Sequence, residues 1–296
     1  MIPRSLVALP TGNETPKMNE IELSAGPLQY VDTAGAGPVV VLLHGLLMDA
    51  SLWDAVVTDL SVDHRCVAPT LPLGAHRRAT NPGVDLSLPG VARLVSEFLE
   101  RLHLEDVVLV GNDTGGAITQ LVMRERDKRV GRVVLVSCEA FDNLPPGATG
   151  KALAMAAKLP PPLFGAFMQQ LRLKAARRLP IAFGTLTKRG DAATARWIRP
   201  LLEQPEIRTE TVRMIRSVFA DPTLLEVTAK DLAGFDRPTH VVWAADDRVM
   251  PRDHGRRLAE LLPQAQFTTI ADSYTLIPLD QPAELADLIR QFSKPR

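Results

Sequence analysis

The chain has 296 residues, of which 46% are hydrophobic and 23% are charged, a composition typical of a globular protein. Basic and acidic residues each number 34, and this zero formal charge argues against nucleic acid as a partner, because phosphate binding needs a basic excess. No apolar run approaches the ~18 residues that span a bilayer, which argues against stable membrane insertion.

The first segments in chain order are a tail and a hairpin. Residues 1–17 have too short an apolar core for a signal peptide and are expected to form a flexible N-terminal tail. From Glu20 to Thr33, two short alternating stretches flank a Gly-Pro and predict a β-hairpin. Further along, Cys66 and Cys138 each end an apolar run. We interpret them as buried thiols in a reducing cytoplasm, which predicts a cytoplasmic protein without a disulfide.

After the hairpin, short apolar strands alternate with helical patterns. The expected strands cover 38–45, 64–70, 106–113, 132–139, 240–247 and 266–273, and the expected helices lie near 51–60, 89–102, from 114 onward, 252–262 and 282–292. Strands this short and apolar are buried on both faces, which predicts an α/β fold with a mostly parallel sheet and helices on both faces. Right-handed crossovers then place the carboxyl ends of the strands, and the loops that follow them, at one edge.

Residues 140–227 break this alternation, since they contain helical patterns and no strand. We interpret them as a helical cap inserted into a core made of residues 18–139 and 228–296. Residues 151–199 carry ten lysines or arginines and one acid, Asp191. Such a charge run is typical of a solvated helix face, and the alternative is an entrance that attracts anionic or membrane-surface substrates.

The strongest chemical motif is VLVGNDTGGA at 108–117, which places Asp113 at a strand-to-helix junction. A Gly-x-nucleophile-x-Gly turn of this kind holds its central residue in a strained conformation, and the glycines let the helix pack closely. The Asp113 side chain then projects above the sheet at a helix N-terminus, where the dipole favours its anion. The alternative is an ordinary N-cap aspartate.

This arrangement resembles the α/β-hydrolase superfamily, and within it the haloalkane dehalogenase and epoxide hydrolase branch, whose nucleophile is also aspartate. The resemblance covers nearly the whole chain after Lys17 and implies the α/β-hydrolase fold. The stretch LLHGLL at 42–47 matches the family's His-Gly loop. The resemblance implies that the backbone N–H groups of Leu46 and Thr114 form the oxyanion hole and that His44 braces the loop through side-chain hydrogen bonds.

Two further acids match family positions. The stretch WAADDRVMP at 243–251 resembles the segment that carries the triad acid, and its spacing assigns that role to Asp247 rather than Asp246. Glu139 follows the strand at 132–138, where some dehalogenases place the acid instead, and we rank it below Asp247. The resemblance implies no cofactor and no metal.

The catalytic histidine is missing. The segment IADSYTLIPLDQP at 270–282 has the frame of the family's histidine loop, but Thr275 occupies the histidine position. Threonine is not a general base near pH 7. Thr114 also stands where dehalogenases place a halide-binding tryptophan, and the chain lacks the cap tyrosines of epoxide hydrolases. Apart from His44, which has a structural role, only His76 of the six histidines is expected on a loop at the active edge; His254 is expected to be exposed in the first turn of a helix.

Three hypotheses follow. The first is a hydrolase of a small, mostly apolar molecule with Asp113 as nucleophile and an incomplete triad, its water activated by His76, by Asp113 itself or by another carboxylate. The second is a non-hydrolytic enzyme of the same fold, with Asp113 as an acid or base of raised pKa. The third is a ligand-binding protein that has lost turnover. A small molecule is the expected partner, and a homodimer is left open.

Overall fold

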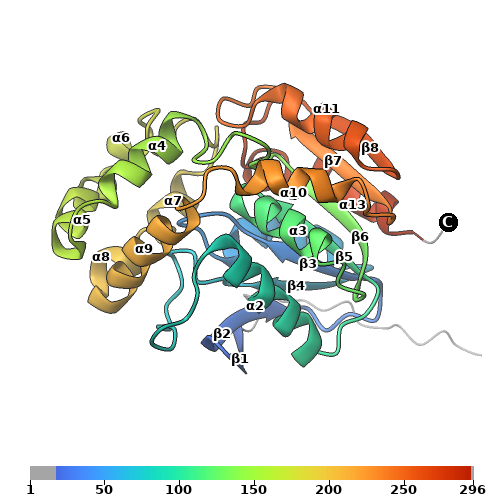
Figure 1. Cartoon of the computed structure of the whole chain (residues 1–296), viewed down its shortest axis with the longest axis horizontal. Helices are drawn as coiled ribbons and strands as arrows, with labels where there is room; N and C mark the ends of the chain where they lie inside the picture. Colours follow the sequence, from blue (N-terminus) through green and yellow to red (C-terminus); the bar gives the residue numbers. More distant parts are fainter. Residues whose placement is uncertain (1–17, 295–296) are drawn as a thin grey trace, which may run out of the picture.

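Eight strands form a single sheet in the computed structural model, which describes residues 18–294 (Figure 1). The sheet order is β1-β2-β4-β3-β5-β6-β7-β8; β2 is antiparallel to β1 and β4, and the other neighbours are parallel. The bounds are β1 (Met18–Leu23), β2 (Gly26–Asp32), β3 (Val39–Leu43), β4 (Arg65–Pro69), β5 (Val107–Asn112), β6 (Val130–Val136), β7 (Thr239–Ala244) and β8 (Ala265–Ile270). The predicted mostly parallel sheet and N-terminal hairpin are confirmed, whereas the tail expected at 1–17 lies outside the described residues.

Helices cover both faces of the sheet, as predicted. On one face α2 (Leu88–Arg101), α3 (Thr114–Arg124), α10 (Leu224–Leu232) and α11 (Arg252–Leu261) pack in succession. The helix α1 (Asp54–Leu60), which follows the short 3-10 helix η1 (Ala50–Trp53), packs with α13 (Pro282–Ser293), which follows the short α12 (Ile277–Asp280). The connection through α1 moves along the sheet in the opposite direction to that through α3, so right-handed crossovers place α1 and α13 on the other face.

Between β6 and β7 the chain forms helices and no strand. The bounds are α4 (Gly147–Ala156), α5 (Pro161–Met168), η2 (Gln169–Arg172), α6 (Lys174–Arg177), α7 (Asp191–Trp197), α8 (Arg199–Glu203) and α9 (Pro205–Val218). In Figure 1 these elements, which we call the cap helices, lie together beyond one edge of the sheet. The expected limit at residue 227 falls inside α10, a helix that packs against α3.

The central strands position the site. β3, β5, β6 and β7 bury nearly every side chain, and they end at Leu43, Asn112, Val136 and Ala244. Because these strands are parallel, the loops after them meet at one edge of the sheet.

Cys66 and Cys138 are buried free thiols, as predicted. Among the helices of residues 18–294, none is long and apolar enough to cross a membrane.

Candidate active site

Asp113 occupies a sharp turn between β5 and α3, with φ 55° and ψ −133°. Such a conformation costs a non-glycine residue about 1–3 kcal/mol, so the surrounding packing has to enforce it. Gly111 and Gly115 permit that packing, because a Cβ on Gly111 would lie 2.3 Å from the Gly115 carbonyl oxygen and one on Gly115 would lie 2.2 Å from the Leu43 carbonyl oxygen. The turn buries the Asp113 side chain, which is 5% exposed.

The loop after β3 closes over the Asp113 carboxylate. A Cβ on Gly45 would lie 2.0 Å from Asp113 Oδ2, so only glycine fits there. Burial, and next the charge of Glu139, raise the pKa of Asp113 well above its ordinary value, whereas hydrogen bonds from the backbone N–H groups of Thr114 and Leu46 act in the opposite direction. The two amides expected to form an oxyanion hole therefore point at the carboxylate.

His44 braces this loop, which confirms its expected structural role. Its Nε2 accepts a hydrogen bond from the Leu71 N–H at 2.9 Å, so Nδ1 carries the proton and donates to the Gly45 carbonyl oxygen at 2.9 Å. Burial lowers the pKa of His44 to about 4. The imidazole is therefore neutral at pH 7, and both of its nitrogens are engaged.

Glu139 is a buried acid in the same cavity as Asp113. The Thr114 hydroxyl donates to its Oε1 at 2.7 Å, and its buried Oε2 has no hydrogen-bond partner among the described residues. Burial raises the pKa of Glu139 to about 7, and the Thr114 hydrogen bond opposes that rise. Since the charge of Glu139 also raises the pKa of Asp113, both carboxyls resist being ionised together, as expected for like charges in one site.

Asp247 contacts Thr275, the two residues expected from the sequence at the positions of a triad acid and histidine. Its Oδ1 accepts hydrogen bonds from the Val249 N–H at 2.9 Å, the Met250 N–H at 2.8 Å and the Thr275 hydroxyl at 2.9 Å. Its Oδ2 is buried and unpaired within residues 18–294, and burial raises the pKa of Asp247. Neither Asp247 nor Thr275 lines the cavity over Asp113.

Asn112, which the sequence analysis did not single out, fixes the backbone of Thr275. Its side-chain amide donates to the Thr275 carbonyl oxygen at 2.8 Å and to the Val136 carbonyl oxygen at 2.9 Å. The residue before Asp113 therefore links the sheet to the loop that carries Thr275. The only sequence signal was a buried amide next to the turn, because buried polar side chains usually have hydrogen-bond partners.

His76 does not line the cavity over Asp113. Its Nδ1 accepts from the Gly74 N–H at 3.3 Å, and its Nε2 lies 2.9 Å from Oε2 of Glu210, a residue of α9. The other Glu210 oxygen accepts from the Thr80 N–H at 2.9 Å. His76 thus links the loop after β4 to the cap helices.

The other histidines also lie away from the cavity. None of the six is among the residues that line it. His64 contacts Ser293 and His240 contacts Thr268, both through Nε2. The expectation that His254 is exposed is wrong: its side chain is buried, and its ring packs edge-on against Phe141 because α11 lies against the loop after β6.

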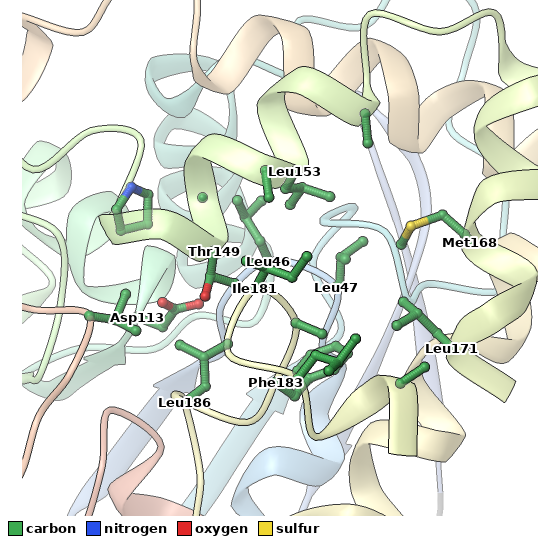
Figure 2. Close-up of a pocket in the computed structure, with 18 of the residues that line it drawn as sticks. Leu46, Leu47, Asp113, Thr149, Leu153, Met168, Leu171, Ile181, Phe183 and Leu186 are labelled. Carbon is green, nitrogen blue, oxygen red and sulfur yellow. The ribbon is translucent and has the colours of Figure 1, made fainter. Parts of the chain in front are cut away.

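The cavity over Asp113 has a volume of about 120 Å³ and is mostly apolar. Figure 2 shows Asp113 at one end and Met168 and Leu171, from the cap helices, at the other. The polar residues of its wall are Asp113, Thr114, Glu139, Thr149 and Gln170. No cluster of three His, Cys, Asp or Glu side chains suited to a metal ion occurs in the described part of the chain.

A mostly parallel sheet with an acid at the sharp turn after the fifth strand, facing one loop amide and one amide at a helix N-terminus, has the architecture of the α/β hydrolases. The family model described as alpha/beta hydrolase fold matches residues 38–282, and the chain belongs to this family.

Haloalkane dehalogenase 2 of Mycobacterium tuberculosis is 27% identical over 272 residues, covering 90% of this chain and 91% of that protein. The solved structure of an ancestral haloalkane dehalogenase has a TM-score of 0.75 at 17% identity and covers 93% of this chain and 98% of its own. The solved structure of a thermophilic esterase from Thermogutta terrifontis has a TM-score of 0.67 at 20% identity and covers 93% of this chain and 97% of its own. The two structural likenesses show the fold, which hosts more than one activity.

Proposed function

We propose that this chain is a hydrolase of small apolar electrophiles in which Asp113 is the nucleophile. The observation that carries the proposal is the placement of the Asp113 carboxylate, which lies in an apolar cavity opposite the N–H groups of Leu46 and Thr114. A relative named haloalkane dehalogenase, 27% identical to this chain, makes alkyl halides the first substrate class to test. The cavity has room for a small molecule and few polar groups to bind a polar one.

In the first step an Asp113 oxygen attacks the substrate carbon that bears the leaving group. The carbon–halogen bond breaks, the halide leaves with the electron pair, and an alkyl ester forms on Asp113. Burial and the charge of Glu139 favour a proton on Asp113, so Asp113 attacks once this proton has passed to Glu139 or to solvent; the attack by the resulting carboxylate needs no further base. The apolar wall removes water from the carboxylate and so strengthens it as a nucleophile.

In the second step Glu139 takes the place of the missing histidine as the base. Water attacks Cγ of the Asp113 ester while its proton passes to Glu139, and the N–H groups of Leu46 and Thr114 stabilise the oxyanion. The Cγ–O bond to the alkyl group then breaks, and Glu139 returns the proton to the departing alcohol. The regenerated acid loses its own proton to solvent. An esterified Asp113 carries no charge, so Glu139 ionises more readily during this step.

The test is a single-turnover reaction of excess protein with a short 1-haloalkane in H₂¹⁸O. We expect halide release, a transient gain of one alkyl group, and then one ¹⁸O atom in the peptide containing Asp113. Asp113→Asn should abolish halide release. Glu139→Gln should leave halide release in place and slow loss of the alkyl group by about 100-fold or more. The matched control is Glu226→Gln, which removes an exposed carboxylate and should behave as wild type.

Different outcomes would favour the other hypotheses. The Thr275 hydroxyl donates to Asp247, and this contact, at the position where the resemblance implies a histidine, supports a protein that binds or traps its ligand. A permanent adduct, or tight binding without reaction, would support that second candidate. Turnover without ¹⁸O in Asp113 would instead indicate that Asp113 acts as an acid or base, as in a non-hydrolytic enzyme of the same fold.

A further inference from the structure

Exposed apolar side chains concentrate on one part of the cap helices. Seven of the ten large hydrophobic residues that are exposed in the described chain lie between positions 155 and 181, so their distribution is not random. We call this surface the cap patch. It consists of Met155, Leu159, Leu163, Phe167, Leu173, Leu179 and Ile181.

The helix at the centre of the cap patch has no polar side chain. α5 reads PPLFGAFM, and Leu163 and Phe167 on it are 56% and 49% exposed. In Figure 1 it lies at the end of the molecule farthest from the labelled C-terminus, with no sheet or core helix covering its outer side. A concentration of exposed apolar side chains of this kind marks a protein or membrane contact.

The segment that carries the cap patch has an excess of positive charge, and Asp191, which pairs with Lys174 and Arg178, is the acid that contacts it. No aspartate or glutamate occurs from residue 143 to residue 190. Lys151 on α4, Lys158 in the turn between α4 and α5, and Arg172 on η2 are all exposed. Exposed leucine and phenylalanine side chains beside lysine and arginine are the combination by which peripheral proteins bind anionic lipid.

The cavity over Asp113 reaches the surface within the cap patch. Phe167, Leu179 and Ile181 are about half exposed, and the same three residues line the cavity. A layer of hydrocarbon lying against the patch would therefore be continuous with the apolar wall of the cavity. An apolar ligand could then pass from that layer into the cavity without crossing water.

We propose that the cap patch docks on the surface of an anionic phospholipid membrane. The apolar side chains enter the acyl boundary, and Lys151, Lys158 and Arg172 contact the headgroups. A second copy of the chain fits this surface less well, because a two-fold contact would bring Lys151, Lys158 and Arg172 of both copies together, and Asp191 is already paired with Lys174 and Arg178. Binding of the cap patch to lipid does not depend on whether Asp113 turns over a substrate.

The experiment is cosedimentation of the full chain with extruded vesicles. Vesicles of 30% phosphatidylglycerol in phosphatidylcholine are compared with pure phosphatidylcholine at 50 and 300 mM NaCl. We expect binding to the anionic vesicles that weakens as salt rises. Each basic residue near an anionic surface contributes roughly fivefold, so the triple variant K151Q/K158Q/R172Q should bind about 100-fold more weakly. L163S/F167S should also lose binding.

Matched controls alter similar residues elsewhere. V62S/V227S removes two exposed apolar side chains outside the patch, and K128Q/K230Q removes two exposed lysines; both should bind as wild type does. Circular dichroism confirms that every variant is folded. Absence of vesicle binding by wild type, or equal loss in the control variants, would overturn the proposal. Self-association of wild type in sedimentation velocity that L163S/F167S abolishes would assign the patch to a second copy and would also overturn it.

Discussion

Replacement of Glu139 by glutamine should change how the free energy of unfolding depends on pH. In the unfolded chain this carboxyl loses its proton near pH 4.5, whereas burial keeps it protonated in the native protein to about pH 7. Between these values the native state binds more protons than the unfolded state, so Glu139 makes the protein less stable as pH rises. The amide of the Glu139→Gln variant would still accept the Thr114 hydrogen bond through its oxygen, and it does not titrate.

The size of the effect follows from that rise in pKa. One pKa unit corresponds to about 1.4 kcal/mol, so the penalty that Glu139 imposes should grow by about 2–3 kcal/mol between pH 5 and pH 8. Relative to wild type, the Glu139→Gln variant should therefore gain this amount of stability across the same interval. Domains of this kind are stable by only about 5–15 kcal/mol, so the change is readily measured.

The assay is urea unfolding followed by circular dichroism at pH 5, 6, 7 and 8, with the free energy extrapolated to water for each protein. Glu226→Gln on α10 removes an exposed carboxylate and should track wild type at every pH. Parallel curves for wild type and Glu139→Gln would refute the reasoning, because they would mean that Glu139 titrates in the folded protein as it does in the unfolded chain.

Three further substitutions test the rest of the site. Thr275→His should speed loss of the alkyl adduct by about 10²–10⁴-fold, measured by intact-protein mass spectrometry; an unchanged lifetime would mean that the imidazole does not reach the ester. Gly45→Ala should slow halide release about 100-fold, because its Cβ would lie 2.0 Å from Asp113 Oδ2 and displace the nucleophile; normal kinetics would show that the loop can yield. His76→Ala should leave the pH–rate profile unchanged and cost about 1–3 kcal/mol in urea unfolding by breaking the contact with Glu210, whereas a lost limb near the histidine pKa would restore a catalytic role.

The sheet could be predicted because its signal is local. A strand such as Val39–Leu43 is apolar at every position, which only a strand buried on both faces requires. No local sequence signal specifies the element against which a helix packs. α10 is amphipathic like the cap helix α9 before it, yet it packs on α3, and nothing in its own residues distinguishes the two surroundings.

In the site, too, features made by neighbouring residues could be predicted, whereas contacts between residues distant in sequence could not. The glycines beside Asp113 reveal the strained turn because neighbouring residues in sequence create it. The surroundings of His76 depend on Glu210, which lies 134 positions later, so its engagement with α9 could not be read from its loop. The pKa of Glu139 likewise depends on how deeply the assembled fold buries it, a quantity that no sequence spacing gives.

The backbone strain at Asp113 has a consequence for protein engineering. A non-glycine residue at φ 55° and ψ −133°, carrying a buried acid, weakens the fold at the one position where the proposed chemistry needs it. Glycine at that position would relieve both costs, so a library screened for heat tolerance alone would enrich substitutions that erase the nucleophile. Thermostabilised variants of this chain therefore have to be selected with a functional readout beside the melting temperature.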